Sequence, residues 1–339
     1  MKSYLPKFVK LLAEAETEEE KALYAKYIMN FRDPRTIDLR VGQEIDNMQE
    51  FDLVDNHSPE NYVNGHLRKR FIQLNSDYFL DYFKEVKKGG SYESYIDDIE
   101  NHPKYLSALI KQAPLDQQYM CEIFAPRIFN EFRVPVVFNT TCKDSDGEEY
   151  VVSLDFIKPN ERLFLLDEAC GNSQFGVELT LKESLEDFNA FVDYCSDKHQ
   201  CTQTRKQKID LEKQFIRSYL LRILLLADWD FSTKNVGLLI NEKTGQMRLA
   251  PNFDLEYCFM SEFPVEEDLM FAYEKYPEIV EKFCKKVEQF SKGKLFAKSK
   301  FETMLEKYSS IDYHRGVKDI YGKQSARIIK ASENMKIKN

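Results

Sequence analysis

LRILLLADWDFSTKNVGLLINEKTGQMRLAPNFDLEYCF, residues 221–259, is the segment from which we interpret the rest of the chain. It begins as a hydrophobic helix and continues into a polar loop that carries Asp228, Asp230 and Asn235. Two short apolar runs flank the turn NEKTG, and this pattern predicts a β-hairpin. The return arm ends in Pro-Asn-Phe-Asp, which places Asp254 directly after the hairpin. The predicted order is therefore helix, Asp-x4-Asn loop, hairpin and aspartate.

This order suits phosphoryl transfer from ATP. Such a reaction needs a carboxylate that orients the attacking hydroxyl, and oxygen ligands that hold Mg²⁺ against the phosphates. Mg²⁺ takes hard oxygen donors, usually one or two of them from the protein. We therefore predict that Asp230 orients the hydroxyl, and that Asn235 and Asp254 bind Mg²⁺. Asp228 is expected to cap the helix end or to support the loop.

The segments ADWDFSTKN and MRLAPNFDLE resemble the catalytic core of the HipA-like serine/threonine kinases. The resemblance matches Asp230 to the catalytic aspartate, and Asn235 and Asp254 to the metal-binding pair. It matches Lys234 to the lysine before the asparagine, where it would offset charge on the γ-phosphate. Ser232 replaces the usual histidine. The resemblance implies an ATP- and Mg²⁺-dependent kinase that phosphorylates protein serine or threonine, including its own.

In the HipA-like kinases that the sequence resembles, a lysine contacts the α- and β-phosphates, and a glutamate on a following helix faces that lysine. The stretch RKRFIQLN offers Lys69, Arg70 or Gln73 at the lysine position, depending on the alignment, and Glu122 matches the glutamate. The hinge that would bind adenine is expected in RLFLLDEACGN. The predicted hinge residues are Leu165, Leu166, Asp167 and Glu168.

Alternating apolar residues between positions 36 and 170 predict a small antiparallel sheet. One hairpin is expected to join a strand at 134–138 to the segment YVVSLDFI through the turn KDSDGEE. Residues 115–132 predict a helix with a kink at Pro126. Within 76–113 we expect a helical insertion, and YLSALIKQAP is one of its helices.

The rest of the chain is predicted to be mostly helical. A helix over 209–227 is apolar almost all round, so it should be buried beneath the polar loop. Amphipathic helices follow from residue 264 onward. Together these patterns predict an α+β, two-lobed protein-kinase-like fold. It would have a helical extension at 1–35, an antiparallel-sheet N-lobe at 36–170 and a helical C-lobe at 171–339.

Composition limits the classes of partner. The chain has 339 residues and a net charge of −9, which disfavours a general nucleic-acid binder. The seven cysteines are scattered, odd in number and without a CxxC pair, which is typical of reduced thiols in the cytoplasm. No signal peptide is visible, and no apolar run approaches the roughly 20 residues of a membrane span. We therefore expect a cytoplasmic protein without a membrane association.

Three other functions remain open from the sequence. The missing phosphate-binding lysine favours a pseudokinase that binds nucleotide without transfer. Lipid kinases of the phosphatidylinositol type have a similar Asp/Asn/Asp order, so a small-molecule or lipid hydroxyl is a second possibility. The third is an interaction module in which these residues only form turns. Expected partners are a protein substrate and, from the resemblance, an antitoxin or another regulatory protein.

Overall fold

The computed structural model describes residues 36–37, 44–45, 69–75, 105–112, 116–144, 149–158, 160–199, 201, 203–292, 298–308 and 311–337. Its helices and small sheets give the α+β class that the sequence predicts. The chain forms two compact units, each made of two segments: unit 1 is 1–119 with 137–161, and unit 2 is 120–136 with 162–339. The predicted helical extension at 1–35 lies outside the described residues, and the two-lobed arrangement stays a prediction.

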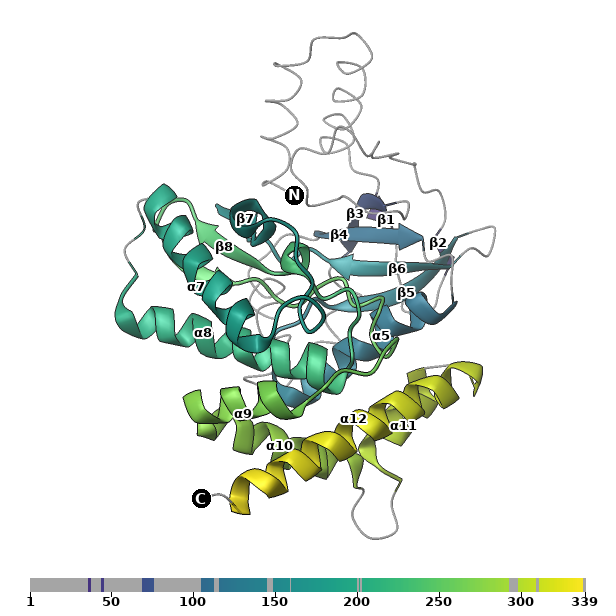
Figure 1. Cartoon of the computed structure of the whole chain (residues 1–339). Coiled ribbons are helices and arrows are strands. Elements are labelled where there is room, and N and C mark those ends of the chain that lie inside the picture. The colour runs from purple at the N-terminus through teal and green to yellow at the C-terminus, as the bar shows by residue number, and fades with distance from the viewer. Residues whose placement is uncertain are drawn as a thin grey trace. The chain divides into compact units, whose positions relative to one another are not determined.

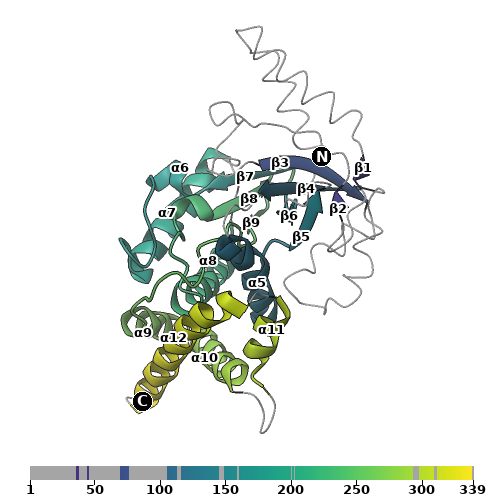
Figure 2. The same cartoon turned by 90° about the vertical axis from the view of Figure 1, so that its right-hand side faces the viewer.

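A six-stranded sheet forms most of the described part of unit 1. Figure 2 shows its longer strands β3, β4, β6 and β5 side by side. These strands pair antiparallel, whereas the two-residue strands β1 and β2 pair parallel with β3 and β5 at the two edges. The predicted antiparallel pairing of β5 with β6 is confirmed. The strands in sheet order are β1 (Thr36–Ile37), β3 (Lys69–Asn75), β4 (Tyr105–Gln112), β6 (Glu149–Leu154), β5 (Asn139–Asp144) and β2 (Glu44–Ile45).

Two predictions in this region are wrong. YLSALIKQAP is not a helix, because its residues 105–112 form the interior strand β4, paired on both sides with β3 and β6. Hydrogen bonds on both sides outweigh the weak helical propensity of so short a segment. The strand predicted at 134–138 is displaced along the chain: of its residues, Phe138 extends the hairpin, with its carbonyl accepting a bond from the Leu154 amide at 3.0 Å. Val136 makes a single parallel bridge with Asn252, and the strand β5 starts only at Asn139.

The second sheet has three strands, β7 (Glu161–Leu165), β8 (Gly237–Asn241) and β9 (Met247–Leu249). β8 and β9 form the predicted antiparallel hairpin, with Leu239 opposite Arg248. Gly237 sits tightly against β7, because a Cβ atom there would come within 2.7 Å of the Phe164 carbonyl oxygen. The hairpin ends beside the loop that carries Asp254, so this sheet sets the position of that residue.

Two capped helices begin the helical part of unit 2. Thr180 caps α7 (Leu181–Lys198) and Thr204 caps α8 (Arg205–Tyr219), each through a reciprocal capping box. The predicted single helix at 209–227 is only partly right, because α8 passes into a π-helix, η2 (Leu220–Leu225). Aromatic rings fill the space around α8. Phe188 stacks on Phe215 with centroids 4.5 Å apart, and Phe175 packs edge-on against Phe231 at 4.8 Å.

The C-terminal helices are those that the sequence predicts, and Pro277 separates the first two at the N-terminus of α10. Figure 1 shows the long helix α12, in yellow, beside α10 and α11. No helix in the described ranges is long and apolar enough to span a membrane. These helices are α9 (Glu266–Lys275), α10 (Pro277–Ser291), α11 (Lys300–Tyr308) and α12 (Ile311–Ile337), and they belong to unit 2 with most of α5 (Asp116–Phe132).

Candidate functional site

The π-helix η2 leads directly into the predicted catalytic loop. Its wide turns leave the Leu226 amide bonded to the Leu221 carbonyl, five residues back, at 2.9 Å. The Leu224 carbonyl accepts a bond from outside η2, from the side-chain Nε2 of Gln324 on α12 at 2.9 Å. Ala227 then adopts a positive φ of 49°, which turns the chain sharply out of the helix. π-Turns are frequent at functional sites, and this one stands directly before Asp228.

Arg222, on η2, connects the two halves of the candidate site. Its side chain is fully buried, as is that of Asp228, and its Nε donates to Asp228 Oδ2 at 2.7 Å. Nη1 donates to the Phe253 carbonyl at 3.1 Å and Nη2 to the Asp254 carbonyl at 2.8 Å. The guanidinium also lies 4.1 Å from the centre of the Phe231 ring. One arginine thus ties the loop to the residues that follow the hairpin.

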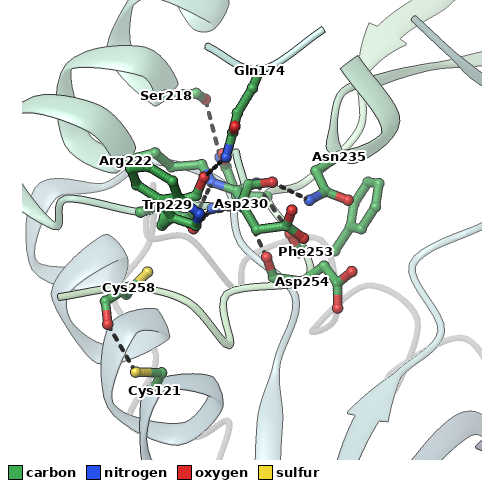
Figure 3. A network of polar contacts seen from close by, with 12 residues as sticks. Cys121, Gln174, Ser218, Arg222, Trp229, Asp230, Asn235, Phe253, Asp254 and Cys258 are labelled. Atoms are coloured by element: carbon green, nitrogen blue, oxygen red, sulfur yellow. Dashed lines mark hydrogen bonds and ion pairs between the residues drawn. The ribbon is translucent and has the colours of Figure 1, made fainter. Parts of the chain in front are cut away.

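Asp230, Asn235 and Asp254 lie together at this point (Figure 3). Asn235 ends the short 3-10 helix η3 (Thr233–Asn235), and its Nδ2 donates to the Asp230 carbonyl at 2.8 Å. Asp254 has a positive φ of 58°, a conformation that aspartate tolerates better than most residues. Its carbonyl faces Arg222 while its side chain lies near Asp230 in Figure 3. The three residues predicted to act together are thus neighbours.

The electrostatics of Asp230 reflect this arrangement. Burial raises the pKa of its carboxyl, and the negative charge of Asp254 raises it further. Arg222, the Asn235 side chain and Lys234 act in the opposite direction and lower the pKa. Lys234 is exposed, and its charge also lowers the pKa of Asp167, which burial raises overall. A carboxylate held near a second carboxylate is a suitable hydrogen-bond acceptor for a hydroxyl group.

Asp228 has a different role from Asp230. Burial raises its pKa to about 6, and the Arg222 guanidinium opposes that rise. Its Oδ1 accepts a hydrogen bond from the Asp230 amide at 3.3 Å. Because the side chain is wholly buried, it cannot reach a substrate hydroxyl. This placement agrees with the predicted supporting role of Asp228.

The segment that contains Gly171 and Ser173 also contacts the loop that carries Asp230 and Asn235. The buried Thr233 hydroxyl donates to the Gly171 carbonyl at 2.8 Å and accepts from the Ser173 amide at 3.0 Å. The Thr233 amide returns a bond to the Ser173 carbonyl at 3.0 Å. Gly171 has a φ of 77°, a conformation that glycine adopts without strain. The loop is therefore held both by Arg222 and by the segment around Gly171 and Ser173.

Three carboxylates, that of Asp254 among them, could hold a cation. One oxygen each of Glu122, Asp254 and Glu256 lie within 4.8 Å of one another, and Glu122 is buried. Mg²⁺ prefers such hard oxygen donors and completes its shell with phosphate and water. The donor set therefore fits this ion. Glu256 is a candidate ligand that the sequence analysis missed; its signal was the carboxylate two residues after Asp254.

The predicted hinge residues occupy the end of β7 and the short helix α6 (Asp167–Cys170). The Leu165 amide donates to Glu168 Oε1 at 3.0 Å, and the Leu166 amide donates to the Val236 carbonyl at 2.9 Å. Both leucine side chains are buried. Two of the amides in the predicted hinge thus bond within the protein, and adenine binding at this segment stays a prediction.

Unit 1 contains a lysine that the sequence analysis overlooked. Lys69, Arg70 and Gln73 lie on β3, and Lys69 pairs in register with Lys111 of β4. The Lys111 side chain is only 5% exposed, a degree of burial that is rare for lysine. It lies in YLSALIKQAP, the segment for which the sequence predicts a helix.

No model of a known protein family matches the chain, and a search of curated proteins gives no match. Among solved structures, the proinflammatory kinase CtkA of Helicobacter pylori is 15% identical over 67% of this chain and 92% of its own, with a TM-score of 0.40. The toxin–antitoxin complex of HipA, HipB and operator DNA from Shewanella oneidensis MR-1 contains a chain that is 11% identical. That match covers 90% of this chain and 70% of the other, with a TM-score of 0.47. With both TM-scores below 0.5, neither likeness establishes a shared fold.

Proposed function

We propose that this protein is a kinase that uses ATP and Mg²⁺ to phosphorylate a serine or threonine hydroxyl of a protein. The observation that carries the proposal is the meeting of Asp230, Asn235 and Asp254 around the buried Arg222. In an interaction module where these three residues only formed turns, nothing would require them to lie close together. The proposal is further supported by the raised pKa of Asp230, since strongly perturbed carboxyls cluster at functional sites.

Each residue has a distinct role in the proposed reaction. Asn235 and Asp254, with Glu122 and Glu256 nearby, would hold Mg²⁺, which neutralises charge on the phosphates. Asp230 accepts a hydrogen bond from the acceptor hydroxyl, aligns its oxygen and takes its proton. The bond from that oxygen to the γ-phosphorus forms as the bond to the bridging oxygen breaks, and ADP leaves. Catalysis of this kind depends mainly on positioning and on charge stabilisation.

The residue that supplies a positive charge to the nucleotide phosphates stays a prediction, with Lys69, Arg70 and Gln73 of β3 as the candidates. A pseudokinase that binds nucleotide without transfer therefore remains the alternative, and an assay of phosphate transfer distinguishes it from an active kinase.

Calorimetry of Mg-ATP binding tests the proposal most directly. Wild-type protein should bind ATP with Mg²⁺ present, and Asp254→Asn should weaken that binding. Binding in EDTA should be weak in both proteins, because the metal bridge is absent. No binding by the wild type under any condition would refute the proposal and favour an interaction module.

Transfer is measured separately, with γ-labelled ATP and the protein alone or with casein. Label on protein serine or threonine in the wild type, and none in Asp230→Asn, would support the protein kinase. Mg-ATP binding without any transfer would identify a pseudokinase. An antitoxin or another regulatory partner, expected from the sequence resemblance, stays a prediction.

A further inference from the structure

A large apolar side chain is exposed beside the candidate site, and a second is exposed on a nearby turn. Trp229 is 44% exposed and stands directly before Asp230 in the chain, and Val177 is 47% exposed. In the described part of the chain, Tyr194 of α7 is the other large hydrophobic residue exposed to a similar extent, at 40%. Exposed tryptophan is uncommon at a solvated surface and common where a partner docks.

Backbone contacts hold Trp229 firmly in this exposed position. Its amide donates to the Tyr257 carbonyl at 3.1 Å, and its carbonyl accepts a bond from the side-chain amide of Gln174. Its ring lies 6.2 Å from the ring of the buried Phe263. Figure 3 shows Trp229 and Gln174 next to Asp230. The tryptophan is thus a fixed neighbour of the proposed base.

Val177 belongs to the turn that Gln174 begins. The Glu178 and Leu179 amides both bond to the Gln174 carbonyl, at 2.9 and 3.3 Å. A Cβ atom at Gly176 would come within 3.2 Å of Phe263, so the turn packs against the same ring that Trp229 faces. Phe263 therefore lies against both Trp229 and the turn that carries Val177. We call Trp229 and Val177 the flanking surface.

The segments that carry the flanking surface have an excess of exposed acidic residues. Within 171–183 and 260–268, Glu262 is ion-paired with Lys323 and Arg327, and Asp268 is buried. The other acidic residues of these segments are the exposed Glu178, Glu183, Glu266 and Glu267, and their basic residue is the exposed Lys182. An anionic membrane attracts basic surfaces, so this charge disfavours a lipid head group as the acceptor. It favours a polypeptide that carries lysine or arginine.

We infer that the flanking surface binds the substrate polypeptide beside its acceptor hydroxyl. A large apolar side chain within about three residues of the serine or threonine packs on Trp229 and Val177, since an extended chain spans about 3.3 Å per residue. Basic side chains farther along the peptide face the acidic segments. This inference deepens the proposed kinase function and rests on it. It assigns Trp229 and Val177 as specificity-determining residues.

A positional-scanning library of peptides with a central serine tests the inference. Each position near the serine is fixed as leucine, alanine, lysine or glutamate, and KM and kcat are measured for the best peptides. The wild type should prefer leucine at one near position and lysine at an outer one. Burying a leucine side chain contributes about 1.5–3 kcal/mol, so the preference over alanine should be about tenfold or more.

Trp229→Ala should raise KM for the leucine peptide about tenfold, which would abolish the preference for leucine over alanine. KM for ATP should not change, because the substitution alters only the peptide side of the site. Tyr194→Ala is the matched control, since it removes an exposed aromatic ring from α7 and should leave both peptides unaffected. Equal losses on leucine and alanine peptides in Trp229→Ala would overturn the inference.

One outcome separates the inference from the proposed function. If the wild type binds Mg-ATP and labels peptides without an apolar preference at any position, the inference fails and the protein kinase proposal stands. If the wild type labels phosphatidylinositol in phosphatidylcholine vesicles and no peptide, the inference and the proposed protein acceptor both fail, and the protein is a kinase with a lipid acceptor. If the wild type does not bind Mg-ATP, the inference and the kinase proposal fail together.

Discussion

Asp228 and Asp230 are two residues apart in the chain, but Asp228 is paired with the buried Arg222 whereas Asp230 lies beside Asp254. Asp228→Asn leaves the buried Arg222 guanidinium without its counter-charge. Breaking a buried pair in this way costs about 3–5 kcal/mol, so urea unfolding should show a large loss of stability. Asp230→Asn should remove transfer and leave the protein at least as stable.

The raised pKa of Asp230 determines whether its replacement by asparagine stabilises or destabilises the protein. Burial and Asp254 raise the folded-state pKa above the ordinary value, so the ionised carboxylate disfavours folding. The stability that this group contributes falls as the pH rises from the unfolded through the folded pKa. At neutral pH a neutral asparagine removes that cost. Equal destabilisation by the two variants, with equal loss of activity, would mean that the base is misassigned.

The pH dependence of kcat/KM should depend on Lys234. The proposed base works ionised, so activity is lost as the pH falls through the Asp230 pKa. Lys234 lowers that pKa, and Lys234→Met should therefore move the acidic limb of the profile to higher pH. Lys243→Met, in the exposed hairpin turn, is the control and should leave the limb in place. A limb that moves to lower pH, or not at all, contradicts this coupling.

At the scale of elements, the junction of η2 with α12 should be energetically important. The buried Gln324 side chain satisfies the Leu224 carbonyl, which the wide π-turn leaves without a partner inside the helix. Gln324→Leu keeps the volume and removes the donor, so it should cost about 1–3 kcal/mol of stability. Chemical denaturation measures the loss, with the exposed Lys330→Ala on the same helix as control. Similar values for both variants would show that the bond contributes little.

The elements also show where sequence patterns succeed. The β8–β9 hairpin and the break at Pro277 could be predicted because turn residues and proline act locally. β4 could not, because its partners β3 and β6 lie 30 or more residues away along the chain and determine its conformation. The polar residues of the site were predictable from their spacing, whereas the buried role of Arg222 was not, since an arginine in an apolar helix gives no sign of its partners.

For the whole molecule, the division of the chain makes a prediction about fragments. Unit 2 includes residues 120–136, although unit 1 residues separate them from 162–339. Phe124 packs against Phe259 and Phe301, with ring centroids 5.9 and 5.6 Å away. The Cys121 thiol and the Pro135 carbonyl bond to the loop around Asp254, at Cys258 and Asn252. Residues 120–136 are therefore part of the unit 2 core.

We expect the fragment 120–339 to unfold cooperatively and the fragment 162–339 not to do so. The longer fragment carries 137–161 as a loop, whose closure costs little compared with the core that it retains. The shorter fragment loses the aromatic contacts of Phe124. Thermal unfolding followed by circular dichroism distinguishes the two. A cooperative transition in 162–339 would show that α5 is dispensable for unit 2.

The π-helix restricts where the sequence of this protein can tolerate insertions and deletions. Six residues in wide turns set the rotation at which the chain leaves α8. Deleting one of them would restore regular turns and swing the following residues by about 100° around the helix axis. Arg222 and Asp228 would then no longer face each other. The exposed turn at 242–246 carries no such constraint, so lineages of this protein should accumulate insertions and deletions there and none in Leu220–Leu225.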